Sequence, residues 1–357
     1  MRKISFLILG IAVLCPFTSQ SQEVATNQNT TEAEWSTARP DGHAPIGIMG
    51  DHLHKKGDWM FSYKFMPMTM SGMLEGSDEM REDALPMPYM AAPKDMNMQM
   101  HMLGVMYAPS DNITLMVMGN YVSNSMDLNR VMEMDMGMNM DRGFETESKG
   151  FGDITIGGLF RVFKANRQSV HGTLSLSIPT GDIDQRGDTP MMANSQLAYP
   201  MQLGSGTFDP SIGLTYLGQS DVLSWGSQTL YKFRTGENSE DYQLGNEFKW
   251  SSWGSIKGSN SLAFSCSINY RKVGTISGKD SDMNPMMMPL FNTDNSGREQ
   301  IDLGIGSNYF VPKGKLKNLR LGLELNLPVY QKVIGIQMQN KIFGTVGIQY
   351  SLGTSCH

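Results

Sequence analysis

Cysteine is nearly absent from this chain of 357 residues, which has only Cys15, Cys266 and Cys356. Cys15 falls in a leader-like start, and the other two are far apart in the sequence. This excludes a disulfide framework and the clustered cysteines of a zinc site. A lipid-modified Cys15 is disfavoured because Leu14, rather than a small residue, precedes it.

Charge and long apolar runs are also scarce. Charged residues make up 18% of the chain, below the share of about 25% usual in soluble domains. The formal net charge of −6 excludes nucleic acid as a partner, because phosphate binding needs a basic face. No stretch after the leader reaches the roughly 18 apolar residues of a membrane-spanning helix.

Signatures of catalysis are missing too. The chain has no phosphate-cradling P-loop and no Gly-x-Ser-x-Gly elbow. His171 shares a strand face with Ser175 and Ser177, but a histidine beside serines in a strand lacks the orienting third group of a nucleophilic site. We therefore expect a protein that is not an enzyme.

The first residues predict export from the cytoplasm. Arg2 and Lys3 precede an apolar stretch from Ile4 to Leu14, which is too short to span a bilayer and is typical of a secretory signal. We assign residues 1–21 to this signal peptide. Residues 22–57 are polar and predict a periplasmic N-terminal segment or a plug, and residues 58–357 are assigned to a barrel.

What the mature chain does contain is alternation with a period of two, as from Met98 to Val122. Alternate side chains of a strand point to opposite faces. Segments of about ten residues with this pattern recur about twelve times, separated by turn formers. The segments are Asp58–Met66, Met98–Ala108, Asn112–Val122, Phe151–Phe163, Ser169–Ile178, Thr207–Leu217, Val222–Phe233, Asp241–Trp250, Ser261–Lys272, Gln300–Phe310, Leu319–Pro328 and Lys341–Leu352.

The connections decide between a soluble β-sandwich and a membrane barrel. Short connections such as Pro109–Asp111 alternate with mostly longer ones such as Pro67–Asn97 and Ser123–Gly150. This alternation is typical of outer-membrane barrels, with short periplasmic turns and long external loops. The sequence thus predicts an all-β, transmembrane antiparallel β-barrel of about 12 strands in the outer membrane of a Gram-negative cell, in contact with its lipid.

Methionine is unusually frequent, with 31 residues, of which 22 lie between Met49 and Met140. Many fall in predicted external loops, beside Asp, Asn, Glu and Gly. Thioethers are soft ligands that select Cu(I), and Met-x-Met places successive sulfurs on one side of an extended chain. The candidate metal ligands of this kind are Met66, Met68, Met70, Met96, Met98, Met100, Met132, Met134, Met136, Met138 and Met140.

Three histidines join this candidate set. His52 and His54 are two residues apart and share a face if the chain is extended, and His101 lies among the methionines. Imidazole is a common ligand of transition metals. The alternatives are a polar lead-in for the histidines and, for the methionines, flexible apolar filler, oxidant scavenging or partner binding.

Two stretches carry a family likeness. Leu197–Asp209 (LAYPMQLGSGTFD), followed by Gly213-Leu214-Thr215-Tyr216, resembles a signature of transporters of the meta-pathway of phenol degradation group, and Phe151-Gly152-Asp153 and Ile178–Asp182 (IPTGD) fit the same pattern. The methionine-rich part resembles a Bacteroidetes-type branch of that group. The resemblance implies an outer-membrane β-barrel that passes small, often apolar molecules.

Three functions remain open at this point. The leading hypothesis is an outer-membrane channel or transporter whose methionine-rich external loops bind a soft metal ion such as Cu(I). The alternatives are a channel for small hydrophobic or aromatic solutes with no metal role and a non-transporting surface-binding barrel. A resident cofactor is not required by any of them, and a periplasmic partner is left open.

Overall fold

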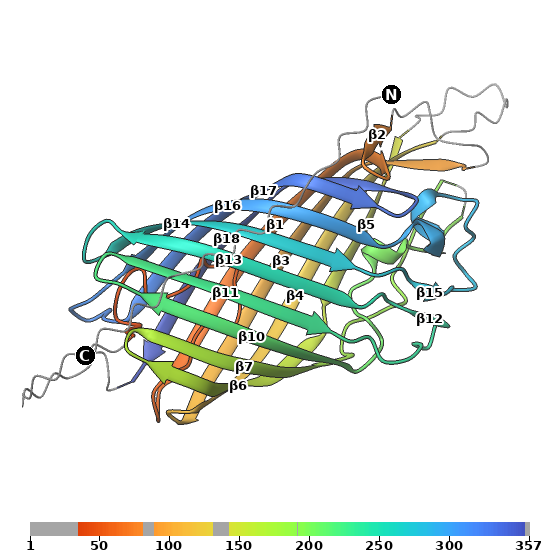
Figure 1. Cartoon of the computed structure of the whole chain (residues 1–357). Helices are drawn as coiled ribbons and strands as arrows, with labels where there is room; N and C mark the ends of the chain where they lie inside the picture. The colour runs from red at the N-terminus through yellow and green to blue at the C-terminus, as the bar shows by residue number, and fades with distance from the viewer. Residues whose placement is uncertain (1–34, 81–88, 131–142, 191, 354–357) are drawn as a thin grey trace, which may run out of the picture. The chain divides into compact units, whose positions relative to one another are not determined.

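The computed structural model describes residues 35–80, 89–130, 143–190 and 192–353. Twelve antiparallel strands form a closed barrel in which each strand pairs with its neighbours and the last pairs with the first (Figure 1). The strands are β1 (Trp59–Glu75), β3 (Ala91–Ser110), β4 (Ile113–Arg130), β6 (Ile154–Ala165), β7 (Gln168–Ile178), β10 (Asp209–Gln219), β11 (Leu223–Lys232), β13 (Glu247–Lys257), β14 (Leu262–Val273), β16 (Arg298–Phe310), β17 (Leu319–Val333) and β18 (Ile336–Leu352).

Smaller elements belong to the long connections at one end of the barrel. Strand β2 pairs with β1, β5 pairs with β4, β8 pairs with β9, and β12 pairs with β15. Three single 3-10 turns complete the set. The bounds are β2 (Asp78–Met80), β5 (Gly143–Phe151), β8 (Arg186–Gly187), β9 (Ser195–Gln196), β12 (Tyr242–Gln243), β15 (Ser277–Gly278), η2 (Tyr199–Met201), η3 (Pro289–Phe291) and η4 (Thr293–Asn295). In the described part of the chain, no helix has the length and apolar character needed to cross a membrane.

The two faces of each barrel strand have opposite chemistry, as β17 shows. Leu321, Leu323 and Leu325 are 37–54% exposed on the outer face, whereas Arg320 and Glu324 are buried in the lumen. Lipid offers no hydrogen bonds, so a sheet in the membrane must close and leave no unpaired edge. An apolar exterior and a polar lumen follow from closing this alternating sequence into a ring.

The predicted all-β barrel with twelve strands, short turns and long loops is confirmed, but several predicted strand ends are wrong. Strand β1 continues to Glu75 and β3 begins at Ala91, so much of the predicted loop Pro67–Asn97 is strand. The expected strands Leu319–Pro328 and Lys341–Leu352 left Val329–Asn340 between them as a loop, but β17 and β18 are separated by a turn of two residues, Ile334 and Gly335. The Met-x-Met alternation is itself a strand pattern, and it extends the ladder hydrogen bonds on both sides.

Candidate functional site in the barrel lumen

Residues 35–57 precede β1 and lie inside the barrel. They form no regular helix or strand, so their backbone groups need partners from the wall. Side chains of seven barrel strands supply hydrogen bonds to this lumen segment, as we call it, from all sides of the ring. These side chains are Lys64 of β1, Thr114 of β4, His171 of β7, Gln219 of β10, Ser224 and Gln228 of β11, Asn308 of β16, and Arg320 and Glu324 of β17.

Three charged wall residues bind the segment's backbone. The Arg320 guanidinium donates to the carbonyl oxygens of residues 37, 39 and 40 at 2.7–3.0 Å. Glu324 Oε2 accepts from the Gly47 amide at 2.7 Å, and Lys64 Nζ donates to the Ile48 carbonyl at 3.2 Å. Hydrogen bonds to charged groups contribute about 1.5–3 kcal/mol each, so this set fixes the position of the segment.

Two wall glycines make room for the segment at its closest approach. A Cβ atom at Gly322 of β17 would lie 2.6 Å from Ile46 Cβ, and one at Gly347 of β18 would lie 2.8 Å from Ile46 Cγ1. Both distances are shorter than real carbon contacts. The absence of a side chain at these two positions therefore allows Ile46 to lie directly against the wall.

Four side chains of the segment converge beneath this contact. The ligand atoms of His43, Asp51 and His52 all lie within 4.8 Å of one another, and all three residues are buried. The ring centroids of His43 and His52 are 4.0 Å apart, and those of His52 and His54 are 4.7 Å apart. His52 Nδ1 lies 2.9 Å from Asp51 Oδ1. We call these four residues the His–Asp cluster.

The cluster has more polar atoms than protein partners. His43 Nδ1, His52 Nε2 and His54 Nε2 are buried without a hydrogen bond. Burial lowers the pKa of His43 well below its usual value and that of His54 to about 3, so both imidazoles are neutral at pH 7. Burial alone would raise the pKa of Asp51, but the charge and hydrogen bond of His52 hold it well below its usual range. His43 and His54 thus present neutral nitrogen lone pairs beside the Asp51 carboxylate.

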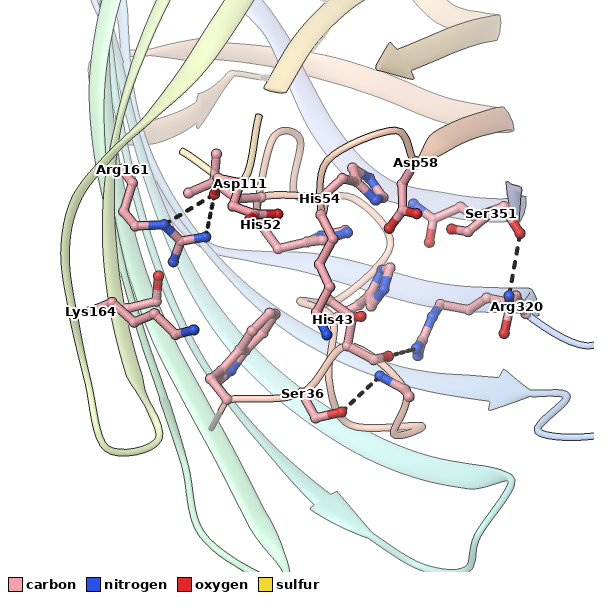
Figure 2. A pocket seen from close by; sticks show the side chains of 18 of the residues that line it. Ser36, His43, His52, His54, Asp58, Asp111, Arg161, Lys164, Arg320 and Ser351 are labelled. Carbon is pink, nitrogen blue, oxygen red and sulfur yellow. Dashed lines mark hydrogen bonds between the residues drawn. The ribbon is translucent and has the colours of Figure 1, made fainter. Parts of the chain in front are cut away.

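A vestibule of about 560 Å³ opens beside the cluster at the end of the barrel that carries the short turns (Figure 2). His43, His52 and His54 line it from the segment, and Arg161 and Arg320 line it from the wall. With short turns on the periplasmic side, this vestibule faces the periplasm. The side chains of the cluster are thus buried, but three of them border a vestibule that is open to solvent on that side.

Methionines line one side of the lumen on β1, β3 and β4. The register pairs Met66 with Met100, Met68 with Met98 and Met70 with Met96, and it pairs Met96 in turn with Met126 of β4. These residues share the inward face with the buried Lys64 and Thr114. Met60, Met106 and Met116 continue the series as far as Leu53 of the lumen segment. We call this series the methionine wall.

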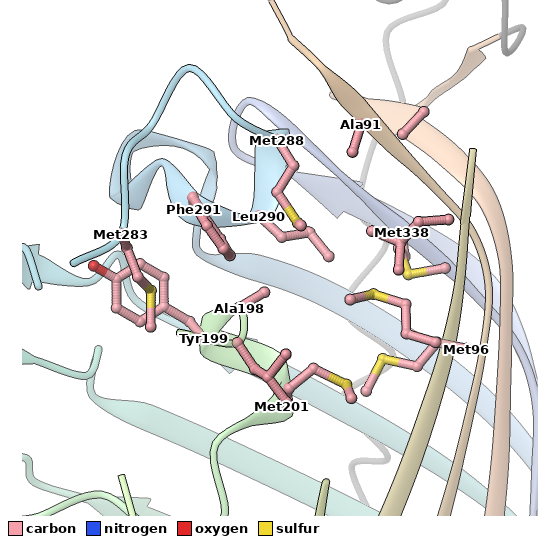
Figure 3. Close-up of a cluster of buried hydrophobic side chains, with 14 of the residues drawn as sticks. Ala91, Met96, Ala198, Tyr199, Met201, Met283, Met288, Leu290, Phe291 and Met338 are labelled. Carbon is pink, nitrogen blue, oxygen red and sulfur yellow. The ribbon is translucent and has the colours of Figure 1, made fainter. Parts of the chain in front are cut away.

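The outer half of the lumen is filled by an apolar cluster that includes the top of the wall (Figure 3). Met201 of η2 and Met283 and Met288 of the β14–β16 connection fold inward to join Met96 and Met338. Tyr199, Leu290 and Phe291 complete its centre. The described parts of the β7–β10 and β14–β16 connections therefore fold over the end of the barrel.

These observations correct the location of the predicted metal ligands. Met68, Met70 and Met96 fell in the predicted loop Pro67–Asn97, but they lie in strands β1 and β3. Together with Met66, Met98 and Met100 they face the lumen. The thioethers of Met96 and Met98 pack in the outer cluster, where apolar filling is needed. Met132, Met134, Met136, Met138 and Met140 lie outside the described residues.

The predicted histidine set is divided by the structure. His52 and His54 meet in the cluster, but His101 lies on the outer face of β3, where its Nδ1 is 2.8 Å from the Tyr63 hydroxyl. His43 and Asp51 were missed. The signal available was composition alone, since residues 43–54 hold three of the chain's six histidines.

Comparison with known proteins agrees with this architecture. The family model described as "Putative MetA-pathway of phenol degradation" matches residues 110–338, more than half of the chain. The chain belongs to this family. No protein with curated annotation matches it in sequence. The resemblance noted in Leu197–Asp209 is thereby confirmed at the level of the family.

Solved structures place the fold among outer-membrane channels. The COG4313 outer membrane channel from Pseudomonas putida F1 is similar with a TM-score of 0.57 at 12% identity, covering 85% of this chain and 99% of that one. A Pseudomonas aeruginosa FadL homologue gives a TM-score of 0.40 at 10% identity, with 88% and 93% covered. The Ralstonia pickettii toluene transporter TbuX gives 0.43 at 9%, with 90% and 98% covered. The first of these likenesses shows that the protein shares the closed barrel fold of an outer-membrane protein.

Proposed function

We propose that this protein is an outer-membrane channel that passes Cu(I), or a cation of similar softness, along the methionine wall. One observation carries the proposal: the β1–β3 register sets Met66, Met68 and Met70 directly opposite Met100, Met98 and Met96. Directly opposed residues in an antiparallel pair have Cβ atoms about 4.5–5.5 Å apart. Two thioethers at that spacing can hold one soft ion between them.

The spacing along the wall suits transfer from one pair to the next. Inward residues of a strand recur every two positions, about 6.8 Å apart. A thioether carries no charge, so it attracts a soft cation without trapping it as a thiolate would. Binding that is favourable but repeated over several weak sites is what conduction requires.

Apolar filling accounts for part of the methionine content, but less well for the middle of the wall. Met96 and Met126 are about 1% exposed within the outer cluster, as filler would be. Met66, Met68, Met100 and Met102 are only partly buried and lie below that cluster. Leucine or valine would fill the same positions, so the repeated choice of sulfur there favours a ligand role.

A small hydrophobic or aromatic solute is the second candidate. The apolar outer cluster, with Tyr199, Leu290 and Phe291, supports it, as does the family's description, which refers to phenol degradation. A solute of this kind would use the same side of the lumen by burial of apolar surface, without needing sulfur.

In either case we propose that the lumen segment is a plug, as expected for the N-terminal region 22–57 to which it belongs. Its hydrogen bonds to Glu324, Lys64 and Arg320 cross the lumen. Passage of any solute then requires the plug to shift.

The test is uptake of Ag(I), a redox-stable soft cation, into vesicles containing the full-length protein. We expect Met98→Leu/Met100→Leu to lower the initial rate about fivefold or more, the effect of losing about 1 kcal/mol. The matched control is Met192→Leu/Met286→Leu, two methionines that are 60% and 55% exposed in the loops. Equal rates in both variants would refute the Cu(I) proposal, and uptake of phenol without Ag(I) uptake would favour the second candidate.

A further inference from the structure

The His–Asp cluster of the lumen segment gathers four potential metal ligands. We propose that His43, Asp51, His52 and His54 bind one divalent transition-metal ion of the Zn²⁺, Ni²⁺ or Cu²⁺ class. The site would be separate from the methionine wall, both in its residues and in its preferred ion. Its role would be to hold the plug in its folded form.

The ligand atoms of the cluster lie close to the spacing that a bound metal ion requires. Nitrogen ligands lie about 2.0–2.1 Å from zinc, so ligand atoms around a tetrahedral ion are about 3.4 Å apart. The ligand atoms of His43, Asp51 and His52 already lie within 4.8 Å of one another. Rotation of the imidazole rings about their side-chain bonds covers the remaining distance. His54, whose ring centroid is 4.7 Å from that of His52, provides a fourth ligand.

Several imidazole nitrogens of the cluster lack a hydrogen-bond partner. Buried polar atoms are almost always hydrogen-bonded, yet His43 Nδ1, His52 Nε2 and His54 Nε2 have no such bond. Leaving a buried acceptor or donor unpaired costs about 1–3 kcal/mol each. Three such atoms on neighbouring rings are explained together by one cation among them.

The types of ligand in the cluster also restrict the kind of metal ion that it would bind. Neutral imidazole nitrogens with a single carboxylate suit borderline divalent ions, whereas thioethers suit Cu(I). Asp51 also accepts a hydrogen bond from the Ala44 amide at 2.9 Å, which orients its carboxylate.

The position of the ligands in the chain explains what the ion would do. His43 and Asp51 are the two ends of a loop whose middle contacts the wall through Gly47, Ile48 and Gly50. An ion bound at both ends would close this loop. It would thereby reduce the conformational freedom that the segment gains when it detaches from the wall. Because His43, His52 and His54 line the vestibule, the ion would enter from the periplasmic side (Figure 2).

Binding is tested on the full-length protein in detergent after treatment with a chelator. We expect it to take up one Co²⁺ per chain, with the intense visible absorption of a four-coordinate site, and Zn²⁺ to displace it. His52→Ala and Asp51→Asn should weaken Co²⁺ binding at least tenfold. His101→Ala is the matched control, because that imidazole lies on the outer face, and it should bind as the wild type does.

A second measurement follows the plug itself. Lys55 and Lys56 have exposed side chains at the end of the segment, but the amides of Lys56 and Gly57 are held by hydrogen bonds to Asp111 Oδ1 and the Ala108 carbonyl. Trypsin cleavage there therefore requires this backbone to open, and it reports detachment of the segment. We expect Zn²⁺ to slow this cleavage several-fold in the wild type and in His101→Ala, but not in His52→Ala. This readout is independent of transport, so failure of the Cu(I) proposal would leave it standing.

The proposal is overturned if the chelated wild-type protein binds no Co²⁺ above the level of the His52→Ala variant. It is also overturned if His101→Ala weakens binding as much as His52→Ala does. Heat-dependent mobility on a denaturing gel shows whether each variant retains the barrel. If His52→Ala loses the fold, the stoichiometry and spectrum of the wild type, together with the conservative variant Asp51→Asn, decide the question.

Discussion

Individual residues of the wall determine whether the lumen segment fits inside the barrel. Glu324 and Arg320 hold the segment through charged hydrogen bonds. They can do so only because Gly322, between them on β17, has no side chain and leaves room for Ile46. Removing a charge would loosen one attachment, whereas adding a side chain at Gly322 would remove the space itself. The glycine is therefore the sharper point at which to test the plug.

Gly322→Leu is expected to displace the segment while leaving the barrel closed. Its Cβ would lie 2.6 Å from Ile46 Cβ, and overpacking of this kind costs about 1–3 kcal/mol. The measurement is single-channel conductance in a planar bilayer, which should rise. Gly254→Leu on β13 is the control, because a Cβ there has no neighbour within 4 Å. Unchanged conductance in Gly322→Leu would show that residues 35–57 do not limit the passage.

The barrel strands differ in the face on which their apolar residues lie. In β17 the leucines meet lipid, and in β3 the methionines face the lumen while Leu103 and Tyr107 face outward. We predict that Leu323→Arg destabilises the folded protein by about 2–4 kcal/mol, the cost of arginine near the middle of the bilayer. Leu316→Arg, in the turn before β17, should cost about 0–1 kcal/mol. Denaturant unfolding in lipid vesicles measures both, and equal losses would contradict the assignment of the outer face.

The alternation predicted the number and faces of the strands, but not where strands β1, β3 and β4 end. Met68, Met70 and Met96 lie beside polar residues, which made the stretch resemble a loop, yet their period of two is a strand pattern that continues beyond the expected membrane thickness. The candidate site was predicted only in part. His43 and Asp51 reach His52 through an irregular segment, and no periodicity encodes that contact.

At the scale of the whole molecule, the barrel depends on pairing between its two most distant strands. Strands β1 and β18 are almost the full mature chain apart, yet they are matched over Trp59–Glu75 with small register shifts. Every other pairing among the twelve barrel strands joins strands that follow one another in chain order. Closure therefore requires the whole sequence, and it fixes the methionine wall against Phe343 and Met338 of β18.

A disulfide across this last contact tests the closure directly. Ser62 and Gln349 are opposite each other in the register, and opposed Cβ atoms about 4.5–5.5 Å apart can be bridged with a small backbone adjustment. We expect Ser62→Cys/Gln349→Cys, in a background with Cys266 and Cys356 replaced by serine, to oxidise within one chain and migrate faster on a non-reducing gel. Ser62→Cys/Ser252→Cys is the control, since β13 pairs only with β11 and β14. Because β13 lies across the lumen from β1, the cysteines introduced at positions 62 and 252 should both stay reduced. Cross-linking of the control, or only dimers from the first pair, would mean that the sheet is not closed as described.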